Sequence, residues 1–437
     1  MDPKAYDLEI RVLKSLKGRF VNTTDMDRRK DLISNVIKTI SYYPDINIDN
    51  IIKDIYDLSP ISELVSSDNI EDIIINNTAN IFVYDGGSGF RKMDMRIETF
   101  EDLELLVHKL RLYATNESAN GNIMDVHLPD GSRVNIISSP LGYDITIRKF
   151  KRRALSILDL INFNELDYQI AARLWMYVDG FRVRPANILI GGLPAAGKTT
   201  LLNAMFSFFR PVERIITIEE TYELDTTTQP NCARLETSQD MPMLELVKNS
   251  LRMRPDIIVV GEVRGEEAKD MITAMNIGKI VLGTIHSSTA RDVINRLQNE
   301  PMNVPKELVP VIDVIVMLGQ VYIDKKPLRK VTQISEIAGI ETQVLLSDLY
   351  KYDYKTHKSA PILPSVTYRD TISTILGIAP SDIIAEEKVR AHMLYAMNRL
   401  GKRDITDING LVRDYYQDPS GTLKKLGLND IEPVIKI

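Results

Sequence analysis

Five short apolar runs constrain the fold of this chain more than any other feature. They are the segments "NILIGG", "RIITIEE", "DIIVVGE", "KIVLGTIH" and "DVIVML", which lie between about Ala154 and Leu349 and are separated by segments of helix length. Their apolar residues are continuous rather than alternating, which is typical of strands buried on both faces. The sequence therefore predicts an α/β domain whose parallel sheet is covered by helices.

The rest of the chain divides around this α/β region. At 437 residues the chain exceeds the usual size of one domain. The patterns predict a helical extension and an α+β domain before the α/β domain, and a small helical domain after it. The expected boundaries are 1–55, 56–150, 151–355 and 356–437, with "RKFKRR", Arg148 to Arg153, as a charged linker.

Composition limits the classes of protein to consider. The net charge of −6 argues against a chain whose whole surface grips nucleic acid but leaves room for a local basic stripe, and we expect no nucleic-acid partner. The single Cys232 cannot form an internal disulfide, and five scattered His without paired Cys give no ligand set for a structural zinc site. No apolar run reaches the roughly 18–20 residues of a membrane helix. We therefore expect a cytoplasmic protein that at most docks on a membrane.

A glycine-rich segment directly after the first apolar run indicates phosphate binding. Its pattern G-x-x-x-x-G-K-T lies between the strand-like "NILI" and a helix-like run, which is the context that a P-loop requires. Lys198 is expected to pair with the β- and γ-phosphates, the Thr199 hydroxyl to bind Mg²⁺ directly, and Thr200 to begin the helix. The predicted nucleotide-binding residues are Gly192, Leu193, Pro194, Ala195, Ala196, Gly197, Lys198, Thr199 and Thr200.

Acidic side chains end two other apolar runs. Gly261 holds the position where many P-loop enzymes have an Asp, and Glu262 follows it, so Glu262 is the predicted general base and a magnesium ligand through water. Glu219, Glu220 and Glu223 follow "RIITI". Of these, Glu219 and Glu223 are predicted catalytic residues, and Glu219 also a magnesium ligand through water. The alternative for Glu262 is a carboxylate with a purely structural role. The alternative for the three acids after "RIITI" is a turn exposed to solvent.

His286 ends the run "GTIH", Gly283 to His286. Parallel strands present their carboxyl ends at one edge of the sheet, so this histidine is expected at the same edge as the phosphate loop. There it would sense the γ-phosphate by gaining or losing a hydrogen bond. The alternative is a core histidine whose hydrogen bonds are satisfied within the protein and which has no role in catalysis.

Together these residues resemble the secretion-ATPase superfamily that powers type II secretion, type IV pili and archaeal surface filaments, and within it the tight-adherence (Tad/CpaF-like) branch. The resemblance covers roughly residues 58–350. It rests on "GGLPAAGKTTLLNAM", "RIITIEETYEL", "LVKNSLRMRPDIIVVGEVRGEEAKDMITAMN" and "GTIHSSTARDVINRL", with "PISELVSSDNIEDIIINN", "LPDGSRVN" and "ITIRKF" in the preceding domain.

This resemblance implies a RecA-like P-loop ATPase domain joined flexibly to the α+β domain, with ATP and Mg²⁺ bound between the two. It also implies a homohexamer that is peripherally associated with the cytoplasmic membrane. Such a motor drives assembly, or also retraction, of a type IV pilus-like filament, or secretion, through a polytopic membrane platform protein and, indirectly, pilin-like subunits. An archaellum motor and a conjugation-type secretion ATPase are the nearest rivals.

The resemblance also assigns arginines. Arg133 in "DGSRVN" and Arg148 in "TIRKF" match positions from which related enzymes send arginines toward the phosphates, so both are predicted catalytic residues. Three more arginines flank the strand that ends in Glu262: Arg252, Arg254 and Arg264. They are either further candidates for contact with the phosphates or residues that link helices.

The chain departs from the family pattern at three places. Pro194 lies within "PAA" where relatives usually have Thr-Gly-Ser, and it removes one N–H donor from the loop. Lys279 replaces a first histidine and cannot accept a hydrogen bond, which argues against a two-histidine relay. Ser238 replaces a common arginine, which shifts phosphate sensing to Arg133 and Arg148.

Two functions of other classes stay open. A nucleic-acid translocase would need a basic groove with stacking side chains, whereas this chain is acidic and Trp175 is its only tryptophan. The second function is a scaffold that responds to a bound nucleotide but does not hydrolyse it. The tail beyond about Thr356 lies outside the common core of the superfamily, and it either caps the ring, contacts a membrane platform or stabilises the fold.

Overall fold

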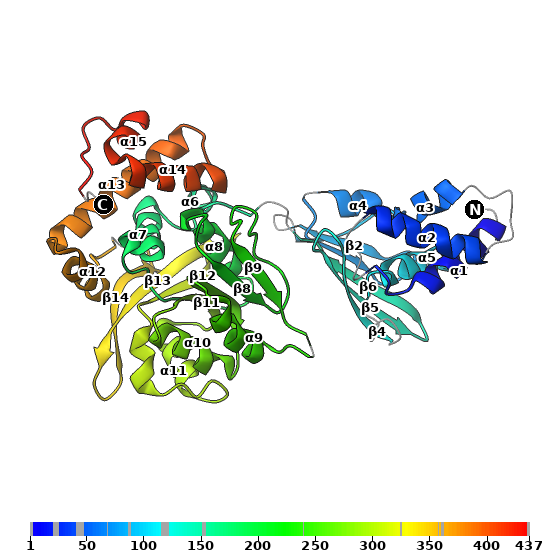
Figure 1. Ribbon diagram of the computed structural model, residues 1–437, viewed down its shortest axis with the longest axis horizontal. Coiled ribbons are helices and arrows are strands. Elements are labelled where there is room, and N and C mark those ends of the chain that lie inside the picture. Colours follow the sequence, from blue (N-terminus) through cyan, green and yellow to red (C-terminus); the bar gives the residue numbers. More distant parts are fainter. Residues whose placement is uncertain are drawn as a thin grey trace. The chain divides into compact units, whose positions relative to one another are not determined.

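A computed structural model of the chain (Figure 1) describes residues 3–20, 26–40, 48–67, 69–85, 89–114, 122–150, 154–238, 240–323, 326–356, 358–359 and 362–434. It divides into two compact units, Met1–Lys151 and Arg152–Ile437. Residues 151–153 of the predicted linker lie outside the described residues. Across the ranges given above, every helix is too short or too polar to cross a bilayer.

The first unit contains an antiparallel sheet with the strand order β3-β2-β1-β6-β5-β4. Alternate strand residues are buried, so one face of the sheet packs on α4 and α5 while the other face stays more exposed. Its elements are α4 (Ser62–Ser66), β1 (Asp72–Ile75), β2 (Ile81–Asp85), β3 (Gly89–Lys92), α5 (Phe100–Arg111), β4 (Ile123–His127), β5 (Arg133–Ser139) and β6 (Gly142–Arg148).

Three amphipathic helices precede this sheet, as the N-terminal periodicity predicts. They are α1 (Pro3–Leu16), α2 (Met26–Ile40) and α3 (Ile48–Tyr56). Their apolar faces share one core with Leu105 and Leu112, which lie in and just after α5. The helices are therefore attached to the sheet by apolar packing.

The second unit is built on a mixed sheet of nine strands in the order β15-β14-β13-β12-β7-β11-β10-β8-β9. The strands from β12 to β9 in this order run parallel, and they include the five apolar runs, so the predicted parallel sheet is confirmed. The structure adds an antiparallel extension, β13 to β15. The strands are β7 (Ile188–Gly192), β8 (Ile215–Glu219), β9 (Cys232–Glu236), β10 (Ile257–Val263), β11 (Ile280–His286), β12 (Val314–Ile323), β13 (Lys326–Ile340), β14 (Val344–Asp353) and β15 (Lys358–Ser359).

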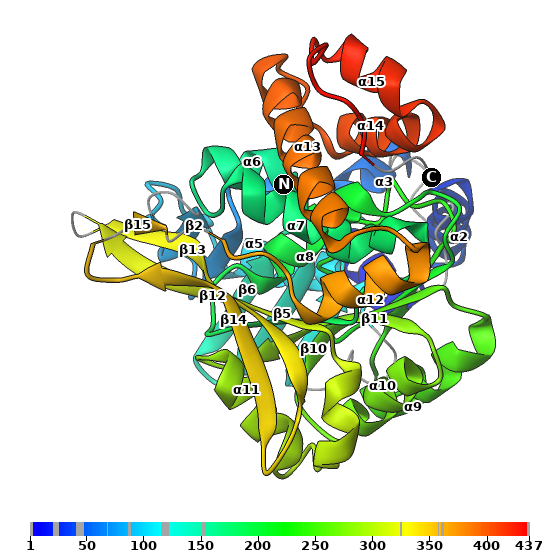
Figure 2. The same ribbon diagram turned by 90° about the vertical axis from the view of Figure 1, so that its left-hand side faces the viewer.

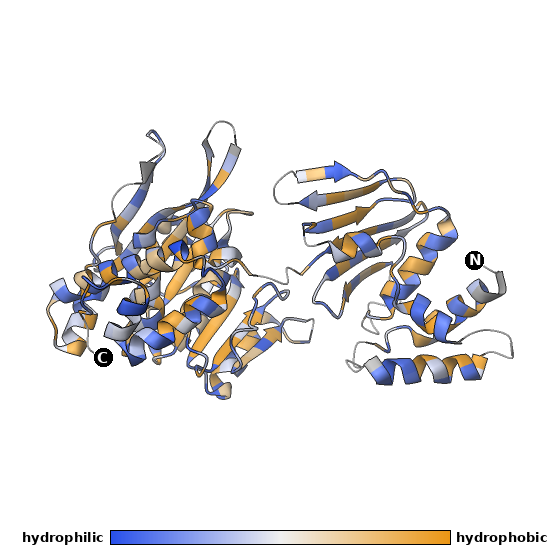
Figure 3. Cartoon of the chain, turned by 90° about the horizontal axis from the view of Figure 1, so that it is seen from above, coloured by the Kyte–Doolittle hydropathy of each residue, from blue (hydrophilic) through white to orange (hydrophobic). Residues whose placement is uncertain are grey.

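Helices cover both faces of this sheet (Figure 2). Ile188 and Ile190 of β7 belong to a core shared with α7, α8 and the C-terminal helices, whereas Leu189 belongs to a core shared with α9, α10 and α11. Figure 3 shows hydrophobic strands in the interior of the unit. The helices are α6 (Ile157–Asn162), α7 (Tyr168–Asp179), α8 (Lys198–Met205), α9 (Met243–Ser250), α10 (Glu267–Asn276), α11 (Ala290–Gln298), α12 (Thr367–Leu376), α13 (Pro380–Arg399), α14 (Ile405–Gln417) and α15 (Pro419–Lys425).

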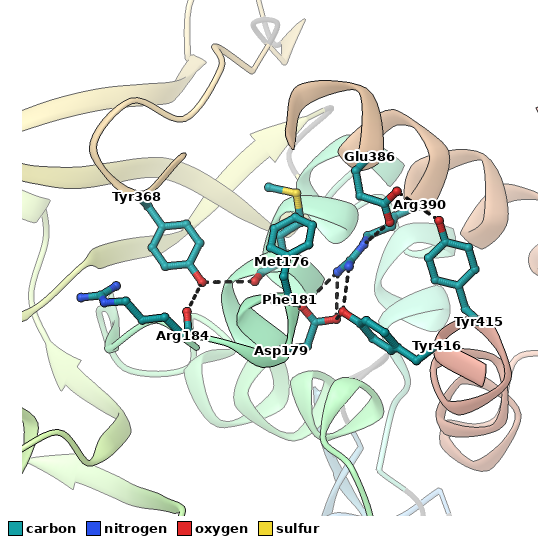
Figure 4. A network of polar contacts seen from close by, with 9 residues as sticks. All are labelled: Met176, Asp179, Phe181, Arg184, Tyr368, Glu386, Arg390, Tyr415 and Tyr416. Atoms are coloured by element: carbon teal, nitrogen blue, oxygen red, sulfur yellow. Dashed lines mark hydrogen bonds and ion pairs between the residues drawn. The ribbon is translucent and has the colours of Figure 1, made fainter. Parts of the chain in front are cut away.

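A buried ionic cluster attaches the C-terminal helices to α7 (Figure 4). Arg390 of α13 is fully buried, and its Nη1 lies 2.8 Å from Oδ2 of Asp179 at the end of α7. Its Nε donates to Glu386 at 3.1 Å. Tyr416 donates to Asp179 at 2.6 Å, and Tyr415 donates to Glu386 at 3.1 Å. The tail is therefore joined to the sheet-bearing core by charge as well as by apolar packing.

Replacement of Arg390 by Leu should destabilise the second unit by about 3–5 kcal/mol, because Asp179 and Glu386 would stay buried without their cation. Urea unfolding followed by fluorescence of Trp175, whose ring centroid lies 4.8 Å from the Arg390 guanidinium, measures this change. The control Arg413→Leu removes an exposed arginine and should change stability by less than about 1 kcal/mol. Equal losses in the two variants would contradict the assigned role of the cluster.

Candidate functional site

The glycine-rich segment forms a tight loop between β7 and α8. Gly197 has φ of 96° and caps α8, and Ala195 has φ of 59°. At Gly192, an added Cβ would lie 2.9 Å from the Leu318 carbonyl oxygen, so this position has no room for a side chain. The helix begins at Lys198, not at Thr200 as predicted. Thr199 and Thr200 therefore lie in the first turn, where backbone N–H groups have no partner within the helix.

Lys198 lies in an environment set by both the loop and the acidic strand. Its Nζ donates to the carbonyl oxygens of Gly192 at 3.0 Å and Leu193 at 3.4 Å. Burial lowers the pKa of Lys198, while the nearby carboxylate of Glu262 opposes this shift. Lys198 therefore lies within electrostatic reach of Glu262.

Neighbouring strands bring further predicted residues to the same edge. In the parallel pairing of β7 and β11, His286 lies directly beside Gly192, the first residue of the loop. Thr284 of β11 is buried, and its hydroxyl donates to the Gly261 carbonyl oxygen at 2.5 Å. These contacts join the carboxyl ends of β7, β11 and β10. The predicted polar residues of the site lie at this edge of the sheet.

Glu262 is held by an ion pair. Arg264 Nη2 lies 2.8 Å from Glu262 Oε2, and Arg264 Nη1 lies 2.8 Å from an oxygen of Glu220. The hydrogen bond with Glu262 is the main cause of the raised pKa of Arg264. Arg264 therefore joins two acidic side chains and does not link helices. Glu267, which the sequence did not single out, accepts the Arg264 and Gly265 N–H groups and fixes the turn after Glu262.

The acids after β8 lie in different environments. Glu219 is only 2% exposed, and its Oε1 accepts the N–H groups of Glu223 and Leu224, both at 2.9 Å. Burial raises the pKa of Glu219 to about 7, although these two hydrogen bonds lower it. Glu220 and Glu223 are exposed. A solvated turn therefore describes Glu220 and Glu223, but not Glu219.

Glu219 also explains why position 261 is a glycine. An added Cβ at Gly261 would lie 3.1 Å from Glu219 Cγ and 3.4 Å from its Cα. The adjacent pairing of Val260 with Ile218 places the two residues side by side. A carboxylate therefore lies beside Gly261, on the neighbouring strand β8.

The predicted arginines lie elsewhere in the chain. Arg133 and Arg148 belong to the first unit, where they are directly opposite each other on β5 and β6. Arg133 Nη2 lies 3.7 Å from Asp125 Oδ1. Arg252 and Arg254 are exposed beside the start of β10.

Two departures from the family pattern have structural explanations. Lys279 precedes β11 and donates to the Pro255 carbonyl oxygen at 3.0 Å. It lies at the opposite end of β11 from His286, about 20 Å away at the usual rise of a strand. A direct relay between these positions is therefore excluded. Ser238 forms a local turn, in which its hydroxyl accepts the Met241 N–H.

Magnesium fits this edge as an ion shared with phosphate oxygens. In the part of the chain that the structure describes, no three His, Cys, Asp or Glu side chains gather as a cage. The Glu219 Oε2 atom is buried and has no hydrogen-bond partner among the described residues, which leaves one acceptor for a bound water. Thr199 would supply the hydroxyl ligand, and Glu262 and Glu219 would hold waters.

Comparison with known proteins identifies a family. Residues 54–325 match the family described as "Type II/IV secretion system protein". Two uncharacterized proteins of Methanocaldococcus jannaschii are 37% and 32% identical over 49% and 68% of this chain. The chain spans only 31% and 56% of their lengths. The type IV secretion system protein VirB11 of Bartonella henselae is 30% identical over 53% of this chain and 76% of its own.

Solved structures of similar proteins include two ATPases. The VirB11 ATPase of Brucella suis, in complex with sulphate, is 22% identical, with a TM-score of 0.34 over 64% of this chain and 93% of its own. The Legionella pneumophila ATPase DotB is 18% identical, with a TM-score of 0.46 over 82% of this chain and 94% of its own.

Replacement of Gly261 by Asp should destabilise the second unit by about 1–3 kcal/mol, because the new side chain would overlap Glu219. Chemical denaturation of both single variants and the Glu219→Ala, Gly261→Asp double variant measures the coupling. Shortening Glu219 makes room, so the double variant should lose less stability than the sum of the single losses. Strictly additive losses would show that the two side chains do not compete for space.

Proposed function

Because the chain belongs to the type II/IV secretion system protein family, we propose that it is a magnesium-dependent ATPase that performs mechanical work at the cytoplasmic membrane. The observation that carries this proposal is geometric: Lys198 follows β7, Glu262 lies near the carboxyl end of β10, and both strands pair in parallel with β11. The cation of Lys198 is suited to bind a phosphate, and the carboxylate of Glu262 is suited to bind a water molecule. Their presence at one sheet edge supports phosphoryl transfer to water.

Phosphate binding falls to the loop and to the start of α8. The first-turn N–H groups and the positive end of the helix attract the β- and γ-phosphates. Lys198 exchanges its bonds to the Gly192 and Leu193 carbonyl oxygens for phosphate oxygens. Mg²⁺, when bound through Thr199, neutralises charge on the phosphates.

Glu262 is the proposed general base. It orients the attacking water and takes its proton as the bond to the γ-phosphate forms. Arg264 restricts the position of the carboxylate through their ion pair. Glu219, shielded from solvent, holds a second water, and Glu223 at the exposed end of the same turn contributes negative charge. His286, beside Gly192, contacts the γ-phosphate and transmits its loss to β11.

Arg133 and Arg148 are proposed to complete the site from the first unit. The two residues lie directly opposite each other on β5 and β6, and guanidinium groups are suited to bind phosphate oxygens. Hydrolysis would remove the shared anion and release the first unit, which couples chemistry to motion.

The motor is proposed to act as a homohexamer on a polytopic membrane platform protein, and through it on pilin-like subunits. The sequence resemblance to the Tad/CpaF-like branch supports a pilus-like filament as the product. Secretion is the second candidate, and one observation favours it: the relatives include a putative conjugal transfer protein of Mycobacterium tuberculosis, 29% identical over 54% of this chain. Identification of the membrane protein that co-purifies with the chain separates the two.

Phosphate release by the purified chain tests the ATPase. Glu262→Gln keeps the size of the side chain but removes the base, so turnover should fall by about 10²–10⁴-fold while ATP still binds. The matched control Glu266→Gln alters an exposed glutamate nearby and should leave turnover unchanged. ATP binding without phosphate release by the wild-type chain would indicate a scaffold. Stimulation by DNA that is lost at high salt would indicate a translocase.

A further inference from the structure

A basic residue on the antiparallel extension of the sheet contacts the phosphate loop. Strand β12 pairs with β7 as far as Leu318 and Gly192, and then continues past the end of β7. In the hairpin of β12 and β13, Gln320 lies directly opposite Arg329. Both side chains therefore lie beside the loop that follows Gly192.

Both side chains donate to the same loop atom. Arg329 Nε donates to the Ala195 carbonyl oxygen at 3.1 Å, and Gln320 Nε2 donates to it at 3.5 Å. That oxygen belongs to the peptide group that also contains the Ala196 N–H, which donates to the Leu193 carbonyl oxygen at 3.2 Å. A planar peptide that is held at its oxygen and at its N–H is fixed in orientation. The hairpin thus helps to fix the shape of the loop just before Gly197.

This peptide needs external support. Ala195 has φ of 59°, in the left-handed region that is unfavourable for a residue other than glycine. Pro194 contributes no N–H, so each remaining donor in the loop matters more. A hydrogen bond from a charged donor is stronger than one between neutral groups and offsets this strain.

The charge of Arg329 is placed where it disfavours the unliganded helix. Arg329 Cδ lies 3.2 Å from the position that a Cβ would occupy on Gly197, the cap of α8. A cation near the positive end of a helix is unfavourable unless an anion is bound there. Arg329 forms no ion pair with a carboxylate in the described part of the chain. The nearby Glu165 is buried; burial raises its pKa, and the charge of Arg329 opposes that shift.

We propose that Arg329, together with Gln320, is a positioning residue of the phosphate cradle: it fixes the 195–196 peptide, and with it the shape of the loop, and adds positive charge beside the loop. This inference rests on the proposed nucleotide binding. Arg329 lies outside the residues 54–325 that match the family. Arg329 would act on the polyphosphate chain of the ligand, so its effect on binding should not depend on the base.

Calorimetric titration of the full-length chain with Mg²⁺–ADP and with inorganic pyrophosphate tests the proposal. Arg329→Gln should weaken both ligands by about tenfold, the loss of one charged hydrogen bond. Arg329→Lys keeps the charge but loses the planar fork, so its loss should be smaller. Addition of guanidinium ion at millimolar concentration should partly restore binding to Arg329→Ala. The control Arg369→Gln removes a partly exposed arginine of α12, which pairs with Asp370, and should bind as the wild type does.

Three results would overturn the proposal. If the wild type binds both ligands and Arg329→Gln binds them with an affinity within twofold of the wild type, the inference about Arg329 is refuted. The proposed nucleotide binding would still stand. A loss of binding that equals the loss of thermal stability of the unliganded variant, without guanidinium rescue, would assign Arg329 a purely structural role. A wild-type chain that binds neither ligand would refute the proposed nucleotide binding, and this inference with it.

Discussion

The second unit depends on one constraint: its central strands are buried on both faces. Side chains of β7, β8, β10 and β11 enter one apolar core or the other, so polar groups are excluded from the strand centres with the exception of a few such as Thr217 and Thr284. Polar groups therefore gather where the strands end. Because these strands are parallel, the loop after β7 and the acids of β8 and β10 share one edge.

The same constraint links catalytic geometry to distant packing. The helix α8 begins at the phosphate loop, and its far end is followed by a short turn of 3₁₀-helix. Asn409 of α14 donates to the carbonyl oxygens of Phe206, Ser207 and Phe209 in this turn, at 3.2, 2.7 and 3.3 Å. The C-terminal helices thus hold the end of α8 opposite the cradle. This arrangement explains how a tail outside the family match forms one compact unit with it.

Much of this arrangement could be predicted from the sequence because the signals are local. Continuous apolar runs identified the parallel strands, and the G-x-x-x-x-G-K-T spacing identified the cradle. The position of Glu262 followed from the end of its strand. By contrast, the contact between Arg329 and Ala195 depends on the register of a hairpin, which no local pattern in the sequence records.

Other features could not be predicted because they arise from neighbouring strands. Gly261 looked like a missing carboxylate until the structure placed Glu219 beside it. The three acids after "RIITI" looked alike, but only Glu219 turns into the core. Lys279 looked like a replaced relay residue, yet it lies at the other end of its strand from His286.

The central claim is that a polyphosphate binds at the start of α8 through the charge of Lys198. The most direct measurement is the affinity of the full-length chain for Mg²⁺–ATP, compared between the wild type and Lys198→Met in the Glu262→Gln background, where hydrolysis does not deplete the ligand. Loss of one charged contact should weaken binding by at least about tenfold. Equal affinities in the two proteins would contradict the account.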